Sequence, residues 1–119
     1  MLKALVANPI MMKAVKAGIP GNGQPFPEGA KIAKLQWKPK KSTEAPFVVD
    51  VPDVCQQAIV MEKDSKRFLT ADGGWGYAVF NYEAASDKFT ADPSPVNCGT
   101  TCHVAVKAKD YIFHPYQKR

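Results

Sequence analysis

The sequence predicts a single domain, residues 1–119, of the α+β class: mainly an antiparallel β-sheet with a few short helices. The length suits one domain with a modest core. Four or five short segments either alternate apolar and polar side chains or are rich in branched and aromatic residues, as strands are. Only two or three short segments carry the signals of a helix. We therefore expect these helices to pack on one layer of sheet.

The first elements are an apolar strand at residues 2–7 and a helix after it. Asn8-Pro9 opens this helix, because Asn caps helices well and Pro is tolerated in the first turn. The helix is expected to run to Ala17 and to end at Gly18, a residue typical of helix C-termini. Pro and Gly crowd residues 19–29, which predicts a loop.

The clearest alternation in the chain lies at residues 31–37, with Ile32 and Lys34 on one side and Ala33, Leu35 and Trp37 on the other. This pattern predicts a strand with one apolar face. The remaining predicted elements are a polar connection at 39–46, strands at 47–51, 55–61 and 75–82, a helical turn at 63–68, a Pro-rich loop at 92–96, a helix at 103–109 and an extended segment at 111–113.

Near the carboxyl end, Cys98-Gly99-Thr100-Thr101-Cys102-His103 places two thiols four residues apart, with a histidine directly after the second. Attachment of a c-type haem uses this chemistry, since two thioether bonds hold the porphyrin and the adjacent His binds the iron. The usual spacing is C-x-x-C-H, and Gly99 can let the backbone absorb one extra residue. The motif therefore indicates a covalent haem c with His103 as iron ligand.

Three other interpretations of these thiols stay open. Cys98 and Cys102 can close a small disulfide loop in an oxidising compartment. They can also join Cys55 and His103 or His114 in a zinc site, or be inert buried thiols. Haem is favoured because neither a disulfide nor an inert thiol requires a His at the next position. Outside such a site, we expect Cys55 to be a small buried hydrophobe and His114 a surface residue.

Composition limits the partners that the chain can have. Hydrophobic residues make up 45% and charged residues 23% of the sequence, as in an ordinary globular domain. The net charge of +5 suits an acidic redox partner protein or an anionic surface, and it also serves solubility. Basic residues do not alternate with aromatic residues along a groove, so we expect no nucleic-acid binding.

No stretch approaches the roughly 20 apolar residues that span a bilayer. Residues 1–12 are apolar, but Pro9 interrupts them and a small-residue cleavage site is missing, so they make a poor signal peptide. Thioether attachment of haem takes place outside the bacterial cytoplasm. We therefore expect a periplasmic protein whose export signal is not present in this chain.

Five stretches, taken together, are similar to those of a known family: Phe26–Lys34, Glu62–Phe68, Gly73–Phe80, Cys98–His103 and Val106–Phe113. The chain resembles the cytochrome P-460 family, which is related to the β-sheet type of cytochrome c′. The order and separations of the stretches agree with the family, and one branch of it shares the longer cysteine spacing. The resemblance covers nearly the whole chain from about Leu2. The family's helix before the first strand is absent here or cut away.

The resemblance implies a largely antiparallel sheet, a homodimer and a covalently bound haem with five-coordinate iron. His103 matches the iron ligand, and Cys98 and Cys102 match the thioether positions. In hydroxylamine-oxidising members a strand lysine is also cross-linked to the porphyrin, and Lys34 matches that lysine. A buried lysine would keep the free amine that bond formation requires. The alternative is a solvated lysine at a sheet edge.

One departure from the family bears on the reaction. Oxidising members place a glutamate over the open side of the iron, where it takes protons from the substrate. Ile59 stands at that position here, and Glu62 would face differently. Ala58, Ile59 and Met61 then make this side apolar, which favours small neutral gases such as nitric oxide or carbon monoxide.

Other residues have two interpretations each. The aromatic residues Trp75, Tyr77 and Phe80 of one predicted strand pack either in the core or around the haem. Asp110 either hydrogen-bonds the iron-binding histidine or caps a turn.

The preferred function is therefore an exported mono-haem c-type cytochrome that binds a small gas at five-coordinate iron or passes electrons to a redox partner. The first alternative is an enzyme that oxidises hydroxylamine or nitric oxide with a haem cross-linked to Lys34. The second is a haem-free domain closed by a Cys98–Cys102 disulfide.

Overall fold

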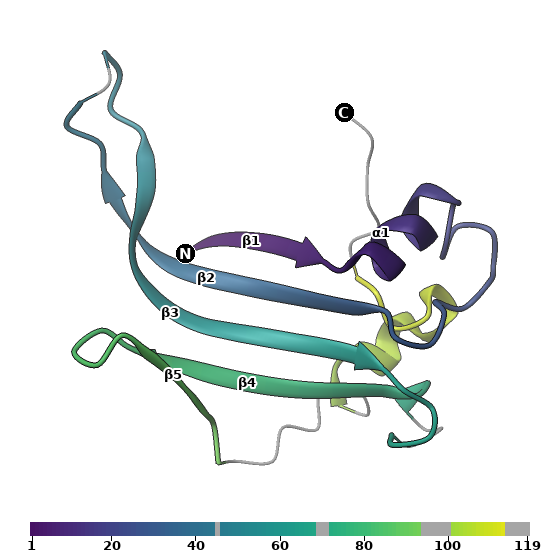
Figure 1. Cartoon of the computed structure of the whole chain (residues 1–119). Coiled ribbons are helices and arrows are strands. Elements are labelled where there is room, and N and C mark those ends of the chain that lie inside the picture. Colours follow the sequence, from purple (N-terminus) through teal and green to yellow (C-terminus); the bar gives the residue numbers. More distant parts are fainter. Residues whose placement is uncertain (45, 69–71, 94–100, 114–119) are drawn as a thin grey trace.

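A five-stranded antiparallel sheet, with its strands in sequence order, is the main feature of the computed structural model (Figure 1). The structure describes residues 1–44, 46–68, 72–93 and 101–113. The elements are β1 (Leu2–Ala7), α1 (Pro9–Lys16), β2 (Lys31–Lys41), β3 (Asp50–Lys63), β4 (Trp75–Glu83), β5 (Lys88–Ala91) and the 3₁₀ helix η2 (His103–Lys109). The predicted antiparallel sheet with short helices is confirmed.

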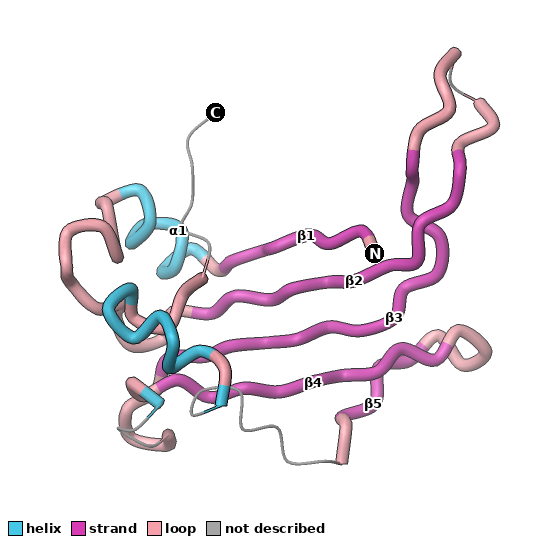
Figure 2. The backbone as a smooth tube through the Cα atoms, turned by 180° about the vertical axis from the view of Figure 1, so that it is seen from behind, coloured by secondary structure: helices cyan, strands magenta, loops and turns pink. Residues whose placement is uncertain are grey.

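The two helices lie at the same end of the sheet, whereas the hairpin between β2 and β3 projects at the opposite end (Figures 1 and 2). The radius of gyration is 16.2 Å, compared with about 13.5 Å for a compact domain of this length. Two exposed ion pairs, Lys40–Asp53 at 3.5 Å and Lys41–Asp50 at 2.7 Å, join the strands of the projecting hairpin.

Asn8 begins α1, as the sequence predicts. Its Oδ1 accepts hydrogen bonds from the backbone N–H of Met11 and of Lys31, both at 3.0 Å, and its Nδ2 donates to the Gly29 carbonyl at 2.8 Å. One side chain thus caps the helix and fixes the entry into β2. The helix ends at the expected place, with Ala17 as its C-cap and Gly18 at a φ of +94°.

The strands differ from the predicted ones in three respects. Residues 55–61 are in a strand as predicted, but they are not separate from the strand predicted at 47–51, because β3 begins at Asp50 and runs through Pro52. Pro52 lies opposite Pro39, next to irregularities in the register, where the missing N–H groups interrupt little of the ladder. The connection predicted at 39–46 starts later, because β2 continues to Lys41. The third difference is β5, a four-residue strand that was not predicted and whose side chains are all exposed.

The two faces of the sheet differ in what covers them. Pairing across the strands assigns Ile32, Met61 and Tyr77 to one face, the helix face, against which Met11 and Ala14 of α1 pack. The other face, which we call the open face, carries a group of apolar residues of which none is buried: Ala4, Val6, Ala33, Leu35, Ala58, Val60, Ala78 and Phe80.

The core lies between the helix face and the helices at one end of the molecule. Its buried hydrophobic residues are Met11, Ala14, Phe26, Ala30, Met61, Trp75, Tyr111 and Ile112. The loop before β2 and the segment after η2 both contribute to it. This small core leaves the rest of the helix face free for a cavity.

Glu28 links the loop before β2 to the turn after β3, and this link should depend on pH. Its carboxylate accepts from the hydroxyl of Ser65 and from the Ser65 N–H, the latter at 2.9 Å. These two bonds hold the pKa of Glu28 below its usual 4.5. A lowered pKa stabilises the fold above pH 4.5, and this contribution is lost as the pH falls through the lower folded value.

We predict that Glu28→Gln lowers the free energy of unfolding at about pH 6, and that its difference from the wild type shrinks toward about pH 3. Urea denaturation at both pH values measures it. Glu44→Gln, in the exposed hairpin, is the control and should follow the wild type. A Glu28→Gln deficit that does not change with pH would contradict the assignment.

Candidate functional site

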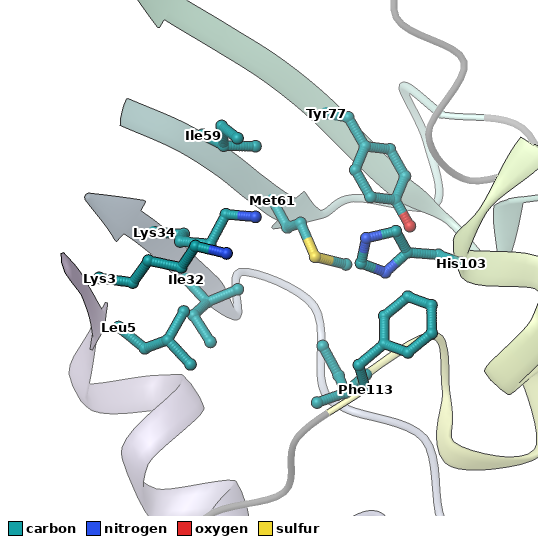
Figure 3. A pocket seen from close by; sticks show the side chains of 10 residues that line it. Lys3, Leu5, Ile32, Lys34, Ile59, Met61, Tyr77, His103 and Phe113 are labelled. Atoms are coloured by element: carbon teal, nitrogen blue, oxygen red, sulfur yellow. The ribbon is translucent and has the colours of Figure 1, made fainter. Parts of the chain in front are cut away.

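A cavity of about 450 Å³ lies on the helix face of the sheet. Strand residues form one wall, and the segment from η2 to Phe113 forms the opposite wall (Figure 3). The residues that line it are Lys3, Leu5, Ile32, Lys34, Ile59, Met61, Tyr77, His103, Ile112 and Phe113.

His103 is the one imidazole among these lining residues, and its orientation is fixed. Its Nδ1 lies 2.6 Å from the carbonyl oxygen of Tyr111. Since a carbonyl can only accept, Nδ1 carries a proton, and in the neutral imidazole Nε2 then keeps its lone pair. Tyr77 packs against the ring at 5.1 Å and Phe113 edge-on at 4.8 Å, between ring centroids. This is the form of histidine that binds a metal through Nε2.

The backbone turns sharply after η2, and the extended segment predicted at 111–113 is wrong. Asp110 and Tyr111 both have positive φ values, 48° and 66°. This turn brings the Tyr111 carbonyl back to His103, which sits at the start of η2. The residue that hydrogen-bonds His103 is therefore Tyr111, through its backbone, and not Asp110.

Asp110 instead forms a buried junction with other segments. Its carboxylate receives both bonds of Lys63 Nζ, at 3.0 and 2.9 Å, and the Phe26 N–H at 2.7 Å. Its carbonyl accepts from the indole nitrogen of Trp75 at 3.0 Å. Of the two roles that the sequence suggested for Asp110, capping a turn is therefore the correct one, since Asp110 is also the C-cap residue of η2.

Lys34 lines the cavity on the same face as Ile32, as the alternation predicts. It is half-buried and lies on β2, between β1 and β3, so it is not at a sheet edge. Lys3 on β1 also lines the cavity, and both amine ends extend into it (Figure 3). Sequence reasoning missed Lys3, although the period of two along β1 puts it on the face of Leu5.

The apolar part of the cavity contains Ile59 and Met61, as expected, but Ala58 belongs to the open face. Glu62 also points away, to ion pairs with Lys31 at 3.5 Å and Arg67 at 3.6 Å. No carboxylate occurs among the described residues that line the cavity.

The three aromatic residues of β4 occupy three different environments. Trp75 is 1% exposed and belongs to the core, in edge contact with Phe26, so it is not part of the lining. Tyr77, two residues on, lines the cavity, and Phe80 lies on the open face. Tyr77 and Phe80 lie on opposite faces because side chains alternate along a strand. Trp75 is on the same face as Tyr77, but it lies at the start of β4, where the core covers it.

Cys102, one of the two cysteines predicted to attach the haem, is an exposed free thiol directly before His103. Cys98 and His114 lie outside the described residues. Cys55 is a half-buried free thiol on β3, opposite Trp37. Within the described ranges there is no cluster of three or more His, Cys, Asp or Glu side chains that could hold a bare metal ion.

The cavity has the chemistry that a haem requires. Its walls are apolar, as the macrocycle is, and His103 offers an Nε2 lone pair to iron. Lys3 and Lys34 carry the charge opposite to that of the two propionate carboxylates. Cys102 is adjacent to His103 in the sequence, which is the arrangement that thioether attachment beside an iron-binding histidine requires.

Comparison with known families agrees with this chemistry: the family model described as Cytochrome P460 matches residues 1–114. The chain belongs to the cytochrome P460 family. As a cytochrome P460 it is a haem-binding protein of the c type. A search of curated proteins found no match to the chain. In the described part of this cytochrome P460, no helix is both long and apolar enough to cross a membrane.

Gly73 allows Tyr111 to reach its position beside His103. Its φ is +66°, and a Cβ there would lie 2.4 Å from Cε2 of Tyr111. Gly23 has a similar φ of +75° but open space around it, so it is a matched control.

We predict that Gly73→Ala lowers the free energy of unfolding by about 1–3 kcal/mol more than Gly23→Ala does. Both variants bear the cost of positive φ, and only the first displaces a packed ring. Urea denaturation measures the difference. Equal losses would show that the approach to Tyr111 does not constrain this position.

Proposed function

We propose that this cytochrome P460 is an exported, periplasmic mono-haem protein whose haem c is covalently bound and whose five-coordinate iron binds a small neutral gas. The observation that carries the proposal is His103, whose Nδ1–H is committed to the Tyr111 carbonyl while its ring faces a cavity lined by apolar side chains. Cys98 and Cys102 are the thioether positions.

When bound, haem supplies an iron atom with one coordination position open to a gas such as nitric oxide or carbon monoxide. The chain's own residues set what can enter. Ile32, Ile59 and Met61 exclude charged groups and water from the apolar wall. His103 would bind the iron, and no described side chain of the lining supplies a carboxylate to take protons from a substrate. This lining favours binding over proton-coupled oxidation. The net charge of +5 also suits electron exchange with an acidic partner protein.

A second candidate is oxidation of hydroxylamine or nitric oxide, and one observation favours it. Lys34 reaches into the cavity from the interior of the sheet, so its amine would be available to a porphyrin held there. A covalent bond from Lys34 to the macrocycle would make the haem a different chromophore. The remaining alternative, a haem-free domain with a Cys98–Cys102 disulfide, differs from both in mass.

We further propose that the protein is a homodimer that buries the open face of the sheet. Its eight apolar residues extend over four strands, and none of them is buried within one chain. Monomeric proteins rarely leave so continuous an apolar surface in water. A second copy would cover it with the same apolar residues, as in an isologous interface.

The first functional prediction concerns the matured protein, produced with an export signal and a haem-attachment system. Its denatured mass should exceed the chain mass by one haem, and its ferrous form should bind carbon monoxide. His103→Ala should keep the added mass, because the thioether bonds do not need the imidazole. It should lose the gas binding, because the iron would lack its protein ligand.

Absorption spectroscopy and mass spectrometry measure these outcomes. A colourless wild type lighter than the thiol form by two hydrogens would indicate the disulfide domain. An altered visible spectrum that reverts in Lys34→Arg would indicate the cross-linked enzyme. Gas affinity at the wild-type level in His103→Ala would refute the ligand assignment.

A second functional prediction tests the dimer. Val60→Lys places a charge at the centre of the open face and should convert a species of twice 13.0 kDa into one of 13.0 kDa. Thr90→Lys adds the same charge on exposed β5 and should remain dimeric. Sedimentation equilibrium measures both. A wild-type protein that sediments as a monomer would contradict the interface.

A further inference from the structure

We infer that the buried Lys63–Asp110 ion pair positions the iron ligand, by fixing the backbone corner whose carbonyl holds His103. Neither residue lines the cavity. The consequence for the iron rests on the proposed haem function, whereas the consequence for the imidazole itself does not.

This ion pair differs from the others in the described part of the chain. Its side chains are 7% and 11% exposed, whereas every other described pair has side chains at least 27% exposed. Removing two charges from water is costly, and apolar replacements of similar shape are often as stable. Such a pair is therefore better explained by the geometry that it enforces than by the stability that it adds.

The geometry around Asp110 is fixed on three sides. Lys63 Nζ bonds both carboxylate oxygens, and the Phe26 N–H bonds one of them. The Trp75 indole N–H holds the Asp110 carbonyl, and Lys63 Nζ lies 5.2 Å from the centre of the Trp75 ring. The end of β3, the loop before β2 and the start of β4 thus all hold one residue.

That residue has a φ of 48°, and Tyr111 after it has a φ of 66°. Two successive residues in the left-handed region of φ cost conformational energy, so they persist only where the surrounding structure imposes this conformation. The corner turns the Tyr111 carbonyl to within 2.6 Å of His103 Nδ1. A firmly held acceptor selects the Nδ1–H tautomer and leaves Nε2 as the donor to iron. It also makes the imidazole a stronger ligand, which lowers the reduction potential of a bound haem.

The test compares two double variants, each of which removes the ion-pair contacts of one charged residue of β3. Lys63→Met/Asp110→Asn removes the buried pair, keeps packing on Trp75 and leaves a residue that tolerates positive φ. Lys31→Met/Glu62→Gln removes the more exposed ion pairs that Glu62 on the same strand makes with Lys31 and Arg67, and it is the control. Nitrogen NMR on the haem-free full chain measures the His103 tautomers. Redox titration and the iron–histidine stretching frequency measure the haem-loaded chain.

We expect the buried-pair variant to lower the ratio of Nδ1–H to Nε2–H tautomer about fivefold, as loss of one ordinary hydrogen bond would. Its potential should rise and its stretching frequency fall, while the control stays at the wild-type values. Lys63→Arg, which keeps the charge, should give a tautomer ratio, a potential and a stretching frequency between those of the wild type and those of the double variant. If the double variant does not fold, Asp110→Asn alone is judged by the same criteria.

An unchanged tautomer ratio in a folded buried-pair variant would overturn the inference, whether or not the chain binds haem. A wild type that takes up no haem but shows the tautomer shift in the variant would instead refute the proposed function and uphold the positioning role. Equal shifts of the tautomer ratio in the control variant would also overturn the inference, since any loss of charge on β3 would then be enough to cause the shift.

Discussion

The hydrogen bond from His103 to the Tyr111 carbonyl is the constraint on which the functional site depends. Helix η2 buries none of its own residues fully, so burial of the helix as a whole contributes little to the position of His103. The position of the helix is instead set at its end, where Asp110 is tied to Lys63 and Tyr111 is packed against Gly73. A charge pair at the end of β3 and a glycine before β4 therefore determine where an imidazole can point. The imidazole belongs to the C-terminal segment, but residues of the sheet and of its connections determine how accurately it is positioned.

The cavity combines two kinds of lining that follow from the period of two in strands. Ile32, Ile59 and Met61 provide an apolar wall, while Lys3 and Lys34 bring positive charge to the same face. A flat cofactor that is apolar in the middle and anionic at one edge matches both. A metal ion alone would match neither, because the described lining has one imidazole and no carboxylate. The lining thus supports the haem assignment independently of the cysteine motif.

The sequence was informative where the signal is local. Asn8-Pro9 and Gly18 predicted α1, and the alternation around Lys34 predicted its shared face with Ile32, because caps and strand periodicity depend on near neighbours. The failures depend on distant partners. Pro52 lies within a strand opposite Pro39, and Asp110 at the corner is bonded to Lys63, 47 residues earlier. Nothing near Asp110 in the sequence announces a left-handed conformation.

The projecting hairpin has a consequence for how the fold can vary. Its rungs are held by Lys40–Asp53 and Lys41–Asp50, and its tip residues Phe47 and Val48 are more than 70% exposed. Its described residues contribute nothing to the cavity lining or to the buried core. Residues can therefore be inserted or deleted at this tip with no change in the geometry of the imidazole, which makes the hairpin a natural attachment point for tags, probes or surface tethers.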